Sequence, residues 1–205
     1  MKKVITLALG IFLLASCFLS CKKGDNDPFL SLMSRKARLV GSWHVSKREI
    51  IATNINGTTT IKIQSIYDGT QNITTTTTIV GTVTTSVVDT MKYSESLDIN
   101  KDGTYKLMNM NANQLDVDIA IGRWMFIGKS KLDNLKKKEA ILMTLTQSII
   151  SNGSSTNTVN YTDLNGSTVV IDELKNKGFV TIVQEDSENS TGLVSSKKTT
   201  KTTYN

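Results

Sequence analysis

The chain has 205 residues, of which 39% are hydrophobic and 6% aromatic, and its formal net charge is +6. This length and hydrophobic content suffice for one buried core, and a single proline excludes a proline-rich disordered chain. The positive charge is spread along the sequence without interleaved aromatic residues, so it does not indicate nucleic-acid binding.

The first residues, MKKVITLALGIFLLAS, have the layout of an export signal. Lys2 and Lys3 form a basic start, and the apolar stretch that follows is too short for a comfortable membrane span. The next residues, 14–17 (LASC), resemble the lipobox of bacterial lipoproteins, in which the signal is cut before a cysteine that carries a diacylglycerol. The resemblance implies a signal peptide over residues 1–16 and lipidation of Cys17. Acyl chains would then anchor the protein to a membrane, at about 0.8 kcal/mol per buried CH₂.

Cys21, the second of the two cysteines, is the alternative lipidation site. Phe18 stands where its lipobox would usually have leucine, but the charged run KKGDND that follows Cys21 resembles the tether of lipoproteins from Bacteroidetes-type bacteria. We therefore predict a tether over residues 17–27 and a folded domain over 28–205. A disulfide between the two cysteines would be strained and would constrain almost nothing. A metal site would lack ligands, because the single histidine, His44, is distant in sequence.

A short helix is expected between the tether and the domain. Asp27 can cap it, Pro28 suits its first position and Gly41 can end it. Apolar residues recur at spacings of three and four over this stretch, which gives one apolar face. The helix is expected to close one end of a core or, as an alternative, to lie on a membrane.

Everything after Gly41 is predicted to form strands, because it is rich in Val, Ile, Thr and Tyr and alternates in places. Asn-Gly and Asp-Gly pairs that favour hairpin turns separate many of the segments. The predicted strands are 43–52, 58–67, 73–88, 92–99, 104–110, 117–127, 140–149, 159–163, 168–173, 179–184 and 193–203. The threonine-rich stretch 58–90 is expected to form long exposed hairpin arms. The fold class predicted is all-β, an antiparallel meander closed into a barrel.

No pattern in the sequence indicates catalysis or a cofactor. There is no G-x-S-x-G elbow and no phosphate-binding glycine loop, and neighbouring carboxylates such as Asp172 and Glu173 point to opposite faces of a strand. The segment 98–103 (DINKDG) begins like a calcium loop, but Asn109 stands where that loop needs a bidentate acid. We expect a simple turn there, no metal site and no enzymatic activity.

The segment Gly41-Ser42-Trp43 follows the predicted helix and opens the first strand. Together with Gly122-Arg123-Trp124 and the stretch 97–105, it resembles the lipocalin-like lipoproteins of Bacteroidetes, a family of calycin-type barrels. The resemblance implies that Trp43 packs across the closed end of the barrel. It also implies Trp124 nearby and a cation from Arg123 or Lys175 over the tryptophan.

The function that this resemblance implies is binding of a small apolar or amphipathic molecule at the outer membrane, on the periplasmic or the surface face. The alternative is an accessory or structural surface lipoprotein that contacts another envelope protein through its threonine-rich strands.

Overall fold

The computed structural model describes residues 34–111, 116–131, 135, 138–162, 166–175, 177–188 and 194–205. Within these residues the chain forms one short α-helix and eleven strands. They are α2 (Arg35–Leu39), β1 (Gly41–Asn56), β2 (Thr59–Tyr67), β3 (Gln71–Val80), β4 (Val83–Ile99), β5 (Thr104–Asn111), β6 (Asp116–Lys129), β7 (Glu139–Ser151), β8 (Thr156–Asn160), β9 (Gly166–Lys175), β10 (Gly178–Glu188) and β11 (Val194–Tyr204).

The strands form one antiparallel sheet in the order β6-β5-β4-β3-β2-β1-β11-β10-β9-β7-β8, and β6 also pairs with β7. That last pairing closes ten strands of the described chain into a barrel, while β8 pairs with the far half of β7 outside the ring. The predicted fold class, an all-β antiparallel meander closed into a barrel with a short N-terminal helix, is confirmed.

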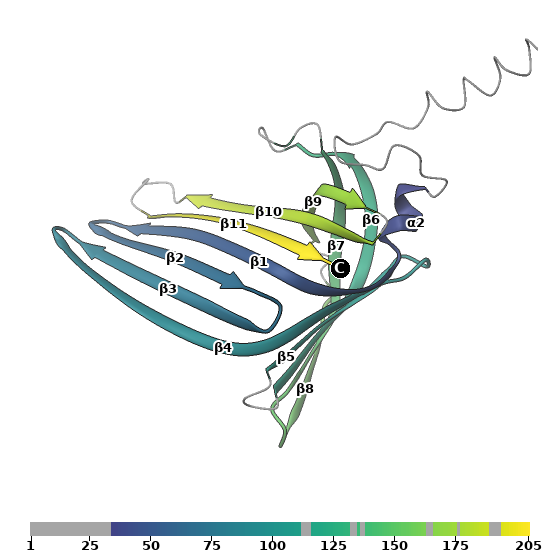
Figure 1. The fold of residues 1–205 in the computed structure, drawn as a ribbon, viewed down its shortest axis with the longest axis horizontal. Helices are drawn as coiled ribbons and strands as arrows, with labels where there is room; N and C mark the ends of the chain where they lie inside the picture. Colours follow the sequence, from purple (N-terminus) through teal and green to yellow (C-terminus); the bar gives the residue numbers. More distant parts are fainter. Residues whose placement is uncertain are drawn as a thin grey trace, which may run out of the picture.

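The ring is narrower at one end than at the other. The first residues of β1, Gly41 to His44, pair directly with the last residues of β4, Ser96 to Ile99. Farther along, the β2–β3 hairpin separates these two strands. In Figure 1 the outer parts of β1–β4, β10 and β11 extend together to the left, while β5, β6, β7 and β8 run downward. The barrel is therefore closed at the end near α2 and splayed at the other.

The helix is shorter at its C-terminal end than predicted. It ends at Leu39, and Val40 already has extended backbone angles (φ −69°, ψ 124°), so that Gly41 begins β1. At the other end Ser34 caps α2, its Oγ accepting a hydrogen bond from the Ala37 backbone N–H at 3.1 Å. The predicted helix start at Asp27 and Pro28 lies outside the described residues.

The predicted strand 73–88 is wrong as one element. Gly81 and Thr82 form a hairpin turn, with Gly81 at φ +57°, a conformation in which glycine avoids the steric cost of a Cβ. The chain reverses there, and β4 then runs without a break through the second predicted strand, 92–99. The long threonine-rich hairpin arms that the sequence predicts are thus present, with their turn inside the segment 73–88.

A candidate ligand cavity in the barrel

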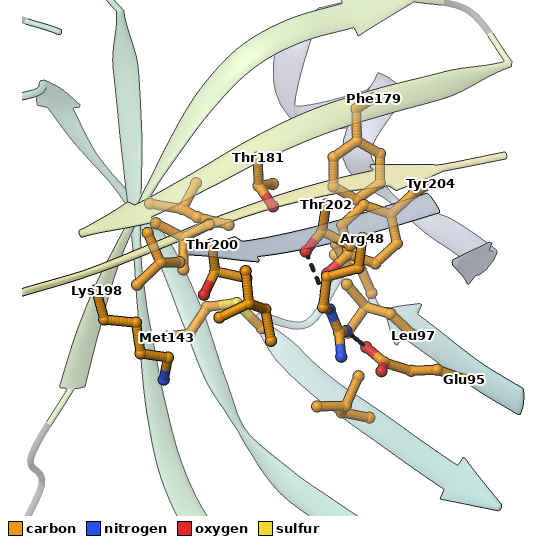
Figure 2. A pocket seen from close by; sticks show the side chains of 16 residues that line it. Arg48, Glu95, Leu97, Met143, Phe179, Thr181, Lys198, Thr200, Thr202 and Tyr204 are labelled. Atoms are coloured by element: carbon orange, nitrogen blue, oxygen red, sulfur yellow. Dashed lines mark hydrogen bonds and ion pairs between the residues drawn. The ribbon is translucent and has the colours of Figure 1, made fainter. Parts of the chain in front are cut away.

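A cavity of about 260 Å³ lies inside the barrel, lined by residues of β1, β4, β5, β7, β9, β10 and β11. These strands can all line the cavity because alternate residues of each strand point to the inner face of the closed sheet. Most of its wall is apolar, and its lining residues include Ile50, Leu97, Leu107, Met143, Phe179 and Val183. Figure 2 shows how the polar side chains Arg48, Thr200 and Thr202 lie among them.

One buried ion pair interrupts the apolar wall. The Arg48 guanidinium contacts the Glu95 carboxylate through Nη2 and Oε1, and its Nε donates to the Thr202 hydroxyl at 3.3 Å. The Arg48 side chain is 19% exposed and the Glu95 side chain 1% exposed. Burial by itself would lower the pKa of Arg48, but the adjacent Glu95 carboxylate more than offsets this, and the pKa is raised. Arg48 therefore stays charged within the barrel.

Aromatic side chains surround this pair. Tyr67 and Tyr93 stack with ring centroids 4.5 Å apart, and the Tyr67 hydroxyl donates to the Tyr93 backbone carbonyl at 3.1 Å. Phe179 and Tyr204 stack at 4.4 Å. Burial, together with the negative charge of Glu95, raises the pKa of Tyr204 to about 12. Burial likewise raises the pKa of Tyr67 and Tyr93. The tyrosines stay neutral at ordinary pH.

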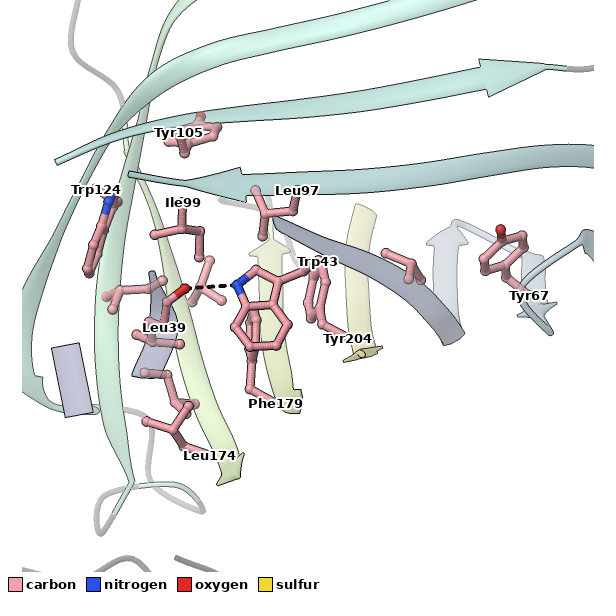
Figure 3. Packing of buried hydrophobic residues seen from close by; sticks show 14 residues of the cluster. Leu39, Trp43, Tyr67, Leu97, Ile99, Tyr105, Trp124, Leu174, Phe179 and Tyr204 are labelled. Carbon is pink, nitrogen blue, oxygen red and sulfur yellow. Dashed lines mark hydrogen bonds between the residues drawn. The ribbon is translucent and has the colours of Figure 1, made fainter. Parts of the chain in front are cut away.

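Trp43 lies at the closed end of the barrel (Figure 3). Its ring meets Phe179 edge-on at 5.1 Å, and its Nε1 donates to the Leu39 carbonyl at 2.9 Å. The hydrogen bond ties the end of α2 to the start of β1. Arg38, also buried, donates from Nη1 to the Leu174 carbonyl at 3.0 Å. The short helix therefore covers this end of the core.

Trp124 belongs to the same core cluster as Trp43, and its Nε1 donates to the Asn100 carbonyl at 3.1 Å. Its neighbour Arg123 is exposed, and so is Lys175, which forms an ion pair with Glu173. Among the described residues, Lys36 of α2 lies over a tryptophan instead, with its Nζ 5.6 Å from the centroid of Trp124. Of the residues that the sequence singled out for barrel closure, Gly41, Trp43 and Trp124 lie at the closed end.

Sequence reasoning missed the pair Arg48–Glu95. Alternation from Trp43 and Val45 would point Lys47 inward and Arg48 outward. The pairing of β1 with β11 shifts between Val45 and Lys47, and such a bulge moves every later residue of the strand to the other face. Glu95 could have been found, because it alternates with Leu97 and Ile99 on one face of β4.

The segment that resembles a calcium loop forms a turn. The Asp102 carboxylate accepts hydrogen bonds from the Thr104 backbone N–H at 2.9 Å and hydroxyl at 2.7 Å, which lowers the pKa of Asp102. Gly103 has φ +87°. Over the described residues there is no group of three or more His, Cys, Asp or Glu side chains that could hold a metal ion.

The fold and cavity define a class, an antiparallel β-barrel with a small internal pocket. No protein-family model, no curated protein and no solved structure matches the chain. In the part of the chain that the structure describes, no helix has both the length and the apolar character needed to cross a membrane. Cys17 and Cys21 lie outside that part.

Proposed function

We propose that this protein is an envelope lipoprotein whose barrel binds a small apolar or amphipathic molecule without catalysing a reaction on it. The observation that carries this proposal is the cavity of about 260 Å³, with apolar walls and one buried ion pair. Ligand pockets have the same character, a mainly apolar lining with a few placed polar groups, and typically measure about 300–1,000 Å³. A cavity just below that range suits a ligand smaller than a typical drug.

The test is retention of a small molecule by the full chain when it is purified from its host envelope. Thr200 is in register with Ile50 on one side and Val183 on the other, and all three line the cavity. Thr200→Trp is therefore expected to fill the cavity and abolish retention, as measured by mass spectrometry of solvent extracts. Thr199→Trp, on the other face of β11, is the matched control and should retain the molecule. A wild-type protein that retains nothing would count against cavity binding.

The anchor is part of the same proposal and rests on residues 1–27 of the sequence. Cys17→Ser should abolish fatty-acid labelling and leave an unprocessed precursor, while Cys21→Ser should change neither. The reverse result would assign the anchor to Cys21, and label retained in both single variants would mean that either cysteine can serve. An unlabelled wild-type protein would end the lipoprotein proposal.

A second candidate function is supported by the outer half of β4. Residues Val83–Lys92 pair with β3 on one side and, among the described residues, with no strand on the other. Val83, Val87 and Val88 are 63–67% exposed there, and the run from Val83 to Val88 carries no charge. The corresponding outer half of β10 carries Glu185, Asp186 and Glu188. Charged side chains of this kind protect an edge strand from pairing with another chain. An uncharged edge fits an accessory lipoprotein that contacts another envelope protein through its threonine-rich strands.

The variant Val87→Lys/Val88→Lys places a cation on each face of this edge. If the edge binds a protein, cross-linking in the host envelope should capture that protein with the wild type and lose it with the variant. Both valines are exposed, so the free energy of unfolding should change by no more than about 0.5 kcal/mol. Ser187→Lys on the charged edge of β10 is the control. Equal capture by wild type and variant would exclude the β4 edge.

A further inference from the structure

Two buried acceptor atoms lie on neighbouring strands of the cavity wall without a hydrogen-bond partner among the described residues. They are Oε2 of Glu95 and Oδ1 of Asn109. Glu95 and Asn109 are directly paired across β4 and β5, so their side chains share one face of the sheet. Glu95 lines the cavity, where Figure 2 shows its carboxylate beside Arg48.

Buried acceptors of this kind nearly always have a donor in folded proteins, because an unsatisfied one keeps the cost of its lost hydration. Neither group can satisfy the other through these atoms, since an ionised carboxylate and an amide oxygen both only accept. The two atoms therefore call for a group that donates hydrogen bonds.

The charges nearby restrict what that group can be. Arg48 already neutralises Glu95 within the barrel, and Lys198, also at the cavity, is paired with Glu185 at 3.0 Å. A carboxylate head would bring further acceptors and a second negative charge to Glu95. An ammonium head would bring a second cation near Arg48. An uncharged head with two hydroxyls adds two donors, one for each acceptor, and leaves the charge balance unchanged.

The next inward pair on the same two strands is apolar. Leu97 is paired with Leu107, and both line the cavity. The polar row of Glu95 and Asn109 thus borders an apolar row that leads toward Ile99 and the closed end. This order suits an amphipathic molecule with its head at Glu95 and Asn109 and its chain directed toward Trp43.

We propose that the cavity selects an uncharged amphipathic molecule, an alkyl chain with two neighbouring hydroxyls at its head, that donates one hydrogen bond to Glu95 and one to Asn109. The inference rests on the proposed cavity binding and adds the chemical class of the ligand. Molecules that share one alkyl chain are therefore expected to bind with affinities that depend on the head group.

The experiment compares 1,2-octanediol, octanoate and octylamine at neutral pH. Each is added to the full chain in lipid nanodiscs, and binding is measured by equilibrium dialysis after subtraction of uptake by empty nanodiscs. We expect octanediol to bind at least tenfold more tightly than either charged compound. Asn109→Leu removes one acceptor at similar volume and should weaken octanediol binding about five- to tenfold, the scale of one neutral hydrogen bond. Asn157→Leu on the exposed strand β8 is the matched control and should bind as the wild type does.

Two results would overturn the proposed ligand class but not cavity binding, and a third would overturn both. Octanoate or octylamine binding as tightly as octanediol would overturn it and leave cavity binding intact. So would octanediol affinity that is unchanged in a folded Asn109→Leu protein. If that variant does not fold, the wild-type comparison of the three heads still decides. Binding of none of the three would overturn the proposed function as well.

Discussion

At the scale of single residues, the charged pair inside the barrel is the feature that departs most from an apolar core. Arg48 and Glu95 come from strands that the β2–β3 hairpin separates over most of their length, and they meet across the interior. A buried pair of this kind adds little net stability over apolar residues, but the loss of one partner leaves the other charge buried and uncompensated.

Glu95→Gln is therefore expected to lower the free energy of unfolding by about 3–5 kcal/mol, because Arg48 would remain charged without its partner. Chemical denaturation measures the change. Glu188→Gln, the same replacement at the exposed end of β10, should cost less than about 0.5 kcal/mol. Replacing both partners, by Arg48→Met and Glu95→Leu, should recover most of the loss, and a double variant less stable than Glu95→Gln would contradict this account.

Tyr204, buried beside Arg48 and Glu95, makes the free energy of unfolding decrease at alkaline pH. The pKa of Tyr204 is about 12 in the folded protein, whereas an unfolded tyrosine titrates near about pH 10. The raised pKa means that the stabilisation is fully present below about pH 10 and is lost as the pH rises to about 12, in total about 3 kcal/mol. Tyr204→Phe should remove this part of the loss in denaturation series, while Tyr67 and Tyr93, whose pKa is also raised, keep a remaining decline. Tyr161→Phe, at an exposed position, should leave the profile as in the wild type.

At the scale of the elements, glycines decide where strands turn and how closely they approach. Gly81 makes the β3–β4 turn at positive φ. Gly122 has another role: it lies opposite Tyr105 on β5, next to the irregularity in the β6–β7 pairing. A Cβ there would lie 2.0 Å from the Thr144 carbonyl oxygen and 2.6 Å from Cε1 of Tyr105. Close packing of β6 between its neighbours thus requires a residue without a side chain.

Gly122→Ala should accordingly destabilise the protein by about 1–3 kcal/mol, since the nearest obstacle is backbone of the adjacent strand, which cannot rotate away. The midpoint of urea unfolding measures this. A loss below about 0.5 kcal/mol would mean that β6 and β7 can separate at this point without cost.

At the scale of the whole molecule, the barrel is a ring of eight strands at its closed end, counted over the described residues, into which a hairpin is inserted. The eight are β1, β4, β5, β6, β7, β9, β10 and β11, because β1 pairs with β4 directly there. The β2–β3 hairpin widens the ring only farther along. The cavity wall does not include β2 or β3, although Tyr67 of β2 stacks on Tyr93 of β4 near the Arg48–Glu95 pair.

Deletion of residues 58–82 would join Gly57 to Val83 and let β1 and β4 continue as one hairpin. We expect this variant to keep a β-type circular dichroism spectrum and cooperative unfolding. It should lose about 3–5 kcal/mol, because Tyr67, a large core side chain that is 1% exposed, is removed. An unfolded product at low temperature would show that the hairpin is needed to close the ring.

The sequence by itself determined the features that depend on neighbouring residues. Alternation and β-branched content indicate the strands, and the glycine pairs at Gly57, Gly69, Gly103 and Gly153 mark turns with positive φ. These features follow from local backbone and side-chain preferences, which a short window of sequence contains. The short helix and the burial of Trp43 were also predictable, the latter from the resemblance at the start of the first strand.

Only the tertiary structure decided which residues form the cavity. The bulge after Val45 turns Arg48 inward, and the pairing of β6 with β7 closes the ring. Closure brings Arg48 and Glu95 together, 47 positions apart in the chain. It also leaves Arg123 outside, although it adjoins the buried Trp124. These outcomes depend on register between distant strands, which the packing of the whole barrel selects, because a shift of one residue would move each side chain of a strand to the opposite face.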